Sequence, residues 1–217
     1  MEWTSTKAVR WRLSLVGLIA GPVLLVVSSV FIVPGGSGGM RADFDAMAAR
    51  PWLLVVQSAL EAAGFAVSLA AFAAVARVAD RRGGALATTG TVLCVLGALG
   101  FMWSAAGGMF LSVLVRMDDR EAGFAAAVAV NGDAVTGALI SVLMLAGEAG
   151  ILLVLLGMLR AGRIRIWPVV LVVAGVVADL VLPGVLSGLT ADVLLLAAAV
   201  WTVLSLRRSG APQGAPA

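Results

Sequence analysis

The sequence predicts an all-α membrane protein, a polytopic bundle of six transmembrane helices. Hydrophobic residues make up 61% of the 217 residues, charged residues make up 12%, and the mean hydropathy is +1.08. Several apolar runs exceed the roughly 20 residues that a helix needs to cross about 30 Å of hydrocarbon. A soluble domain of this length needs far more charge to cover its surface, so the composition indicates a multi-pass membrane protein.

Prolines, glycines and charged residues divide the apolar runs into separate spans. The expected spans are 13–33, 52–76, 85–115, 134–159, 166–183 and 188–206. They form one transmembrane domain over 13–206, between a cytoplasmic N-terminal segment, 1–12, and a disordered cytoplasmic tail, 207–217. The first span follows a basic segment as a signal peptide does, but no convincing cleavage pattern follows it, and we interpret it as a retained helix.

Positive charge predicts the orientation of these spans. Eleven of the 15 Lys and Arg residues fall in four clusters beside apolar runs, and the clusters are Lys7, Arg10 and Arg12; Arg77, Arg81 and Arg82; Arg160, Arg163 and Arg165; and Arg207 with Arg208. The positive-inside rule places the clusters, and therefore both termini, in the cytoplasm. Charge distributed in this way marks membrane topology, so we expect no nucleic-acid partner.

Two segments on the opposite side of the membrane are long enough to lie over it as lids. The segment 34–51 has a glycine-rich start followed by a stretch that favours a short helix, and the segment 116–133 is acidic and then apolar. The span 85–115 between them is longer than one crossing requires. It must tilt, bend at one of its glycines or project beyond the bilayer.

The inventory of reactive residues excludes several kinds of site. The chain has no histidine and one cysteine, Cys94, so it lacks the commonest transition-metal ligand and cannot form an internal disulfide. It also has no Walker-type phosphate loop and no Ser/His/Asp arrangement. We therefore expect neither a metal nor a cofactor.

Three acids lie inside apolar spans, where an ionisable group is costly. They are Glu61, Glu148 and Asp179, and no Lys or Arg lies in the apolar part of any span. An acid at the centre of a bilayer helix costs about 2.5 to 3.5 kcal/mol on insertion scales, so each needs a compensating role. Depths of roughly 14 Å, 21 Å and 20 Å from the starts of their spans allow the three to share one cavity. We take them as the candidate catalytic residues.

Side chains at helical spacing from the acids are the candidate substrate-binding residues. They are Gln57, Phe65 and Ser68 near Glu61, and Ser141 and Met144 near Glu148. Met102, Trp103 and Phe110 of the third span join them as an aromatic and sulfur-containing wall, although lipid-facing or packing positions are the commoner use of such residues. Two other acids, Asp133 and Asp192, lie close to span boundaries and are interpreted as solvated or helix-start acids.

Burial in an apolar medium disfavours a charged carboxylate, so we expect at least some of the three acids to be protonated near neutral pH. Protonated and ionised acids side by side are the usual components of an acid–base site. Three classes of protein use such groups without metal or nucleotide: an intramembrane acid catalyst, a proton-coupled transporter, and a structural or partner-binding subunit in which the acids hydrogen-bond between helices.

The acids in "QSALEAAGF" and "VVADLVLPG" give the chain a resemblance to the small integral membrane terpene cyclases, which include fungal meroterpenoid cyclases and actinobacterial indole-sesquiterpene cyclases. These are short, metal-free helical bundles with one acid on an early helix and another on a late one. The resemblance implies that Glu61 donates the proton, that Asp179 supports protonation or deprotonation, and that a prenylated lipophilic molecule is the substrate. Glu148 has no assured counterpart, and the fungal proteins generally have a seventh span.

The resemblance covers overall size, composition and these two placements, and it extends to uncharacterised six-span actinobacterial membrane proteins. It implies residence in a bacterial plasma membrane, among membrane lipids. A transporter remains an alternative because six spans divide into two halves of three, with the acid-bearing second and fifth spans at corresponding positions. A homo-oligomer is compatible with either function.

Overall fold

The computed structural model describes residues 2–31, 39–79, 82–182 and 185–208. These residues form eight α-helices and one short 3-10 helix, and they contain no strand. The helices are α1 (Glu2–Val30), α2 (Gly39–Ala49), α3 (Pro51–Val75), η1 (Ala76–Val78), α4 (Gly84–Leu114), α5 (Arg120–Asn131), α6 (Ala134–Arg160), α7 (Trp167–Val181) and α8 (Val185–Arg208). The expected all-α class is therefore confirmed.

Five helices are long and apolar enough to cross a membrane, as expected of a multi-pass membrane protein. They are α1 from Val9 onward, α3 with η1, α4, α6 and α8 from Leu186 onward. The fifth expected span, 166–183, corresponds to α7, which is apolar but has only 15 residues. Such a helix rises about 22 Å, less than the hydrocarbon thickness. Most of the expected tail, from 209 onward, lies outside the described residues.

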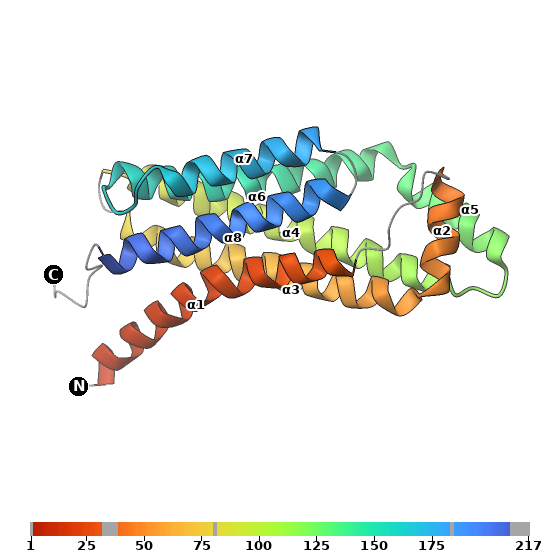
Figure 1. Cartoon of the computed structure of the whole chain (residues 1–217), viewed down its shortest axis with the longest axis horizontal. Coiled ribbons are helices and arrows are strands. Elements are labelled where there is room, and N and C mark those ends of the chain that lie inside the picture. The colour runs from red at the N-terminus through yellow and green to blue at the C-terminus, as the bar shows by residue number, and fades with distance from the viewer. Residues whose placement is uncertain (1, 32–38, 80–81, 183–184, 209–217) are drawn as a thin grey trace.

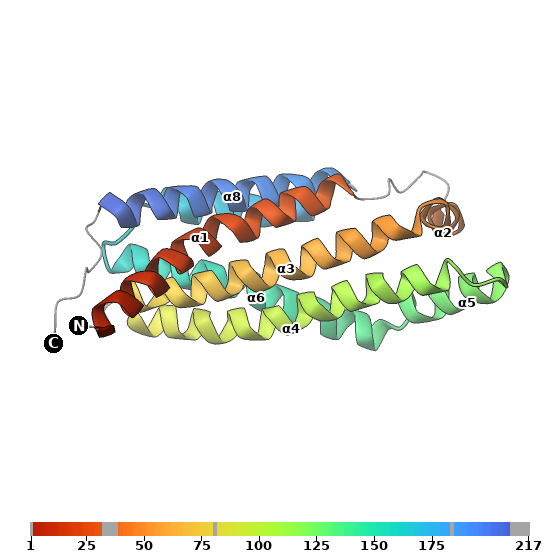
Figure 2. The ribbon, with the colours of Figure 1, turned by 90° about the horizontal axis from the view of Figure 1, so that it is seen from below.

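The six longest helices form a ring. Going round it, α6 packs on α4, α4 on α3, α3 on α1, α1 on α8 and α8 on α7, while α7 meets α6 over a shorter stretch. Figure 2 shows α1 lying along α8, and α3 lying along α4. The first residues of α1 and the last residues of α8 lie at one end of the bundle, which we call the terminal end, and α2 and α5 lie at the other, which we call the cap end (Figure 1).

Glycines bring the helix backbones of neighbouring helices into direct contact. A Cβ added to Gly90 of α4 would lie 2.6 Å from the carbonyl oxygen of Gly150 of α6, and Gly97 of α4 meets the backbone of Gly147 in the same way. Between α1 and α3, a Cβ on Gly21 would lie 2.9 Å from the carbonyl oxygen of Gly64. In lipid, where burial of apolar surface gives helices little reason to associate, such close contact is the main source of packing energy.

A methyl group at Gly97 must therefore separate α4 from α6. We expect Gly97→Ala to lower the free energy of unfolding by about 1–3 kcal/mol, the usual cost of overpacking. The matched control is Gly107→Ala on the same helix, where an added Cβ meets nothing within 4 Å. Thermal unfolding in detergent measures both, and equal stability of the two variants would contradict the glycine contact.

Large side chains fill the bundle at the terminal end. Phe72 of α3, Leu155 and Met158 of α6, and Leu206 of α8 are fully buried there in one continuous core. A second, smaller core at the cap end lies between α2, α3, α4 and α5, and its buried residues are Phe44, Leu54, Leu114, Val115 and Ala127. The bundle is thus filled by packing at its terminal end, and α2 and α5 pack on α3 and α4 at its cap end.

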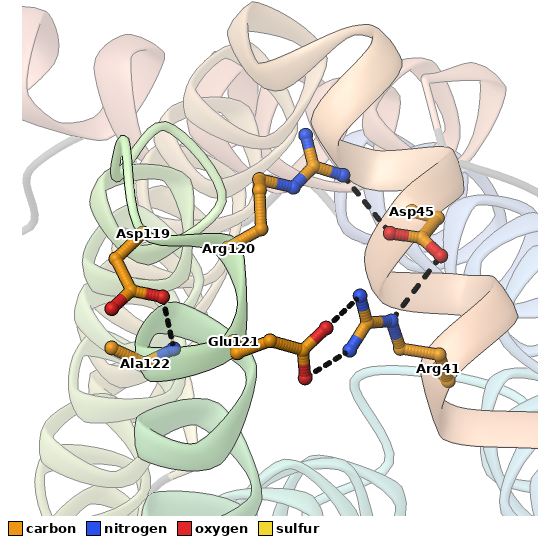
Figure 3. A network of polar contacts seen from close by, with 6 residues as sticks. All are labelled: Arg41, Asp45, Asp119, Arg120, Glu121 and Ala122. Atoms are coloured by element: carbon orange, nitrogen blue, oxygen red, sulfur yellow. Dashed lines mark hydrogen bonds and ion pairs between the residues drawn. The ribbon is translucent and has the colours of Figure 1, made fainter.

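Ion pairs join α2 to α5 across this second core (Figure 3). The Arg41 guanidinium binds both carboxylate oxygens of Glu121, at 2.8 and 2.9 Å, and also contacts Asp45 at 3.3 Å. Arg120 donates to Asp45 at 2.9 Å. Beneath the charges, the rings of Phe44 and Phe124 meet edge to face with centroids 5.5 Å apart. Both loops that the sequence marks as external lids therefore contain a helix, and the two helices form one cap.

The cap should loosen in acid. Hydrogen bonds from Arg120 and Arg41 lower the pKa values of Asp45 and Glu121 respectively. A carboxyl group with a lowered pKa stabilises the folded chain above its ordinary pKa of about 4, and this contribution is lost as the pH falls through the lowered value. We expect amide protection of α2 and α5, corrected for intrinsic exchange, to fall between about pH 7 and about pH 3. Protection of α4 and α6 near Gly97 serves as the internal reference, and a cap equally protected at both pH values would contradict the prediction.

Candidate functional site

One cavity lies inside the ring of six helices, toward the cap end. Its volume is about 240 Å³. A cavity that holds one water molecule needs about 10–15 Å³ by this kind of measure, so there is room for an organic molecule. The lining residues are Leu25, Ser28 and Ser29 of α1; Gln57, Glu61 and Phe65 of α3; Phe101 of α4; Met144, Glu148 and Ile151 of α6; Val172, Gly175, Val176 and Asp179 of α7; and Gly188, Ala191, Asp192 and Leu195 of α8.

The structure brings the three intramembrane acids together in this cavity. Glu61 and Glu148 lie about 15 and 21 Å from the first residues of α3 and α6, and Asp179 lies in the last turn of α7. The acids can lie at the same level along the bundle although their distances from the helix ends differ. The reason is that α6 extends further toward the cap end than α7 does (Figure 1). Glu61 and Glu148 are half-buried, and Asp179 is more exposed.

A fourth acid, Asp192 of α8, lines the same cavity, and the expectation that it is a solvated acid at a helix start was wrong. The helix begins seven residues earlier, at Val185, so Asp192 lies about 10 Å along it. Asp133 does have such a position, because its carboxylate caps α6 by accepting from the Thr136 amide at 3.0 Å.

A short repeated pattern in the sequence could have revealed Asp192. Asp179 ends the stretch Gly-Val-Val-Ala-Asp, which begins at Gly175, and Asp192 ends Gly-Leu-Thr-Ala-Asp, which begins at Gly188. All four of these residues line the cavity. Glycine and aspartate four positions apart share one helix face, so each copy places a carboxyl group beside an open space on the inner face of the α7–α8 hairpin.

The four carboxyl groups form a connected set. Asp192 interacts electrostatically with both Glu61 and Asp179, and Asp179 in turn interacts with Glu148. No Lys or Arg is among the described residues that line the cavity.

Asp192 differs from the other three acids in having a protein hydrogen-bond partner within the described part of the chain. The Ser29 hydroxyl of α1 donates to its Oδ2 at 2.7 Å and so ties α1 to α8. The neighbouring Ser28 hydroxyl donates to the Leu25 carbonyl of its own helix, also at 2.7 Å, and the Ser29 hydroxyl has the same carbonyl as a second, longer contact at 3.2 Å. Ser29 therefore holds the Asp192 carboxyl group in a defined orientation at one side of the cavity.

Two stacked aromatic rings form another side. The rings of Phe65 and Phe101 are 3.5 Å apart between centroids and inclined by 12°. Phe65 was a candidate from the sequence, but Phe101 was not. Phe101 lies at helical spacing from Gly90 and Gly97, which face α6, so the glycine pattern of α4 identifies the inward face on which it lies.

The other sequence candidates divide between the cavity and the lipid-facing surface. Gln57 and Met144 line the cavity with Phe65. Ser141 is exposed, and Ser68 is fully buried one turn beyond the cavity, where it faces Gly21 of α1. Three more candidates, Met102, Trp103 and Phe110, are each about half exposed on α4 and lie outside the cavity. Their placement corrects the expected aromatic wall, because the glycine-bearing face of α4 turns these side chains outward.

The comparisons with known proteins leave the site to be interpreted from its own residues. The chain matches no protein-family model, no curated protein and no solved structure. Within the described residues, no group of three or more His, Cys, Asp or Glu side chains is arranged to hold a metal ion. The cavity holds four carboxyl groups and two stacked aromatic rings among apolar side chains.

The Ser29–Asp192 hydrogen bond predicts a difference between two adjacent serines. Ser29→Ala leaves the Asp192 carboxyl without that donor, and we expect a loss of unfolding free energy on the order of 1–3 kcal/mol. It should also shift the infrared carbonyl band that Asp192→Asn removes. Ser28→Ala, at the same cavity, removes only a bond within α1 and should shift neither property appreciably. Identical effects of the two variants would show that the bond does not orient Asp192.

Proposed function

We propose that this protein is an integral membrane acid catalyst, a metal-independent cyclase that protonates a prenylated lipophilic substrate. The observation that carries the proposal is the convergence of Glu61, Glu148, Asp179 and Asp192 with a stacked aromatic pair in one cavity. An alkene or epoxide is a weak base, so its protonation needs a neutral acid in a site from which water is largely excluded. Four acids in one largely apolar cavity supply this combination when one of them is neutral.

The reaction needs one proton donor and one proton acceptor. Glu61 gives its proton to an alkene carbon or an epoxide oxygen of the substrate, and the neighbouring double bond attacks the resulting cation to close a ring. Loss of a proton from the cyclic cation to a carboxylate then forms the product double bond, so no proton is gained or lost overall. Asp192, oriented by Ser29 and next to Glu61, suits the acceptor role, and transfer through the connected acids restores Glu61.

The aromatic pair contributes to the step between these two proton transfers. The face of an aromatic ring attracts a cation, and the attraction increases when water is excluded. Phe65 lies one helical turn from Glu61, so a cation formed by that acid arises next to the stacked rings. Ile151 and Val172 add an apolar surface against which a prenyl chain can fold.

The resemblance to small membrane terpene cyclases supports the same chemistry, with one change. The late acid of that pattern has two counterparts here, Asp179 and Asp192, on the two helices of one hairpin. We place the protein in a bacterial plasma membrane with six crossings, α7 included, and with both termini in the cytoplasm, since the basic clusters lie at the terminal end.

Neutral amide variants test the assignment of the acids. We expect membranes that contain the protein to cyclise a prenylated or epoxyprenylated aromatic substrate without added Mg²⁺. Glu61→Gln should lower kcat by about 10²–10⁴-fold, the usual contribution of a general acid, and Asp179→Asn or Asp192→Asn should also reduce turnover. Asp133→Asn is the matched control, because asparagine still caps α6 and Asp133 lies outside the cavity. Full turnover by both Glu61→Gln and Asp192→Asn, measured by mass spectrometry of extracted product, would refute the proposed roles.

A proton-coupled transporter is the second candidate, favoured by the connected chain of acids from Glu61 through Asp192 and Asp179 to Glu148. Such a protein would move a solute into proteoliposomes in response to a pH gradient and leave it chemically unchanged. Flux without product would favour transport, and product without flux would favour catalysis. Loss of assembly in the acid variants, with neither flux nor product in the parent protein, would instead indicate a structural subunit.

A further inference from the structure

The cavity reaches the last turn of α7 and the first turn of α8. Asp179 is two residues from the end of α7, and Gly188 is in the first turn of α8. On the opposite wall, Glu148 lies fourteen residues into α6, so about 21 Å of that helix continues from Glu148 toward the cap end. Figure 1 shows that α7 and α8 end well short of α2 and α5. We call this difference in helix reach, at the end of α7 and the start of α8, the step.

The residues at the step are strongly exposed and apolar. Leu180 and Val181 at the end of α7 are 76% and 73% exposed, and Leu186 at the start of α8 is 61% exposed. The more exposed position of Asp179, compared with Glu61 and Glu148, follows from its place at this edge. In a membrane protein an apolar edge of this kind faces hydrocarbon, while the acids lie further in.

The inner face of the hairpin at this level is made of small residues. Gly175 and Ala191 pack together, since a Cβ on Gly175 would lie 3.5 Å from the Ala191 carbonyl oxygen. A Cβ on Gly188 would meet nothing within 4 Å, although Gly188 lines the cavity. Among the described atoms, the space beside Gly188 is therefore free, and Leu186, two residues before it, is 61% exposed.

We propose that this opening is the substrate entrance, and that the hydrocarbon chain of a lipophilic ligand lies in it, past Gly188, with its reactive end at the acids. The ligand enters from the leaflet on the cap side of the membrane without crossing water. The prenyl nature of the chain rests on the proposed function, whereas the position of the entrance rests on the hairpin itself.

A bulky residue at Gly188 tests the entrance directly. The probe is a farnesyl alcohol that carries a diazirine on its chain, supplied in phosphatidylcholine vesicles that contain the protein. Photolabelling of the peptides around Glu61 and Glu148 should fall at least tenfold in Gly188→Phe. The matched control is Gly137→Phe in α6, where an added Cβ also meets nothing within 4 Å but which lies outside the cavity lining, and its labelling should equal that of the parent protein.

Gly188→Leu provides a second variant with a smaller side chain, expected to reduce labelling partially, and decides the question if Gly188→Phe does not fold. Equal labelling of the Gly188 and Gly137 variants would overturn the entrance. A phosphatidylcholine with a diazirine on its acyl chain forms a separate arm, and labelling of the cavity by that lipid, with none by the farnesyl probe, would overturn a prenyl occupant. Because labelling requires no turnover, it is also measured in Glu61→Gln, so the entrance can stand even where the cyclase proposal fails.

Discussion

The distance between helix backbones is the constraint on which this structure depends. In lipid the helices gain little from burying apolar side chains, so they must touch closely to stay together. Where Gly90 and Gly97 of α4 meet Gly150 and Gly147 of α6, the backbones are in contact. On the opposite side of the ring, Gly188 lines the cavity, and no described atom lies within 4 Å of a Cβ added there. Glycine therefore allows close helix contact between α4 and α6 and leaves free space at the cavity.

This arrangement separates two tasks along the bundle. Phe72, Leu155, Met158 and Leu206 fill the terminal end, so that half supplies stability. The acids gather nearer the cap end, where Gly175, Gly188 and Ala191 of α7 and α8 line the cavity. Asp192 interacts electrostatically with Glu61 and Asp179, so the acids influence one another. The hydrogen bond from Ser29 fixes the orientation of Asp192.

Periodicity and composition were sufficient to predict the five long apolar helices, but not α5 or the start of α8. The energetic cost of an acid inside an apolar helix was sufficient to find three of the four acids. Glu61, Glu148 and Asp179 stand out because nothing else in their spans is charged. Asp192 was missed because its depth depends on where α8 begins, and a boundary error of three residues moved it from the interior to the surface. Phe101 was missed, and Trp103 chosen, because adjacent residues on a helix differ by about 100° in direction, and only the glycines show which direction is inward.

The shortness of α7 has a consequence for the lipid around the protein. On the six-crossing topology proposed above, a helix of about 22 Å must match a hydrocarbon layer of about 30 Å, and a bilayer meets such a mismatch by thinning locally. On the same topology, the thinning is expected beside the C-terminal end of α7 and the N-terminal end of α8. Lipid chains displaced there from their normal packing would let a dissolved molecule leave the bilayer with less disturbance than elsewhere. A change in membrane thickness would therefore affect the lipid on the α7–α8 side of the protein most.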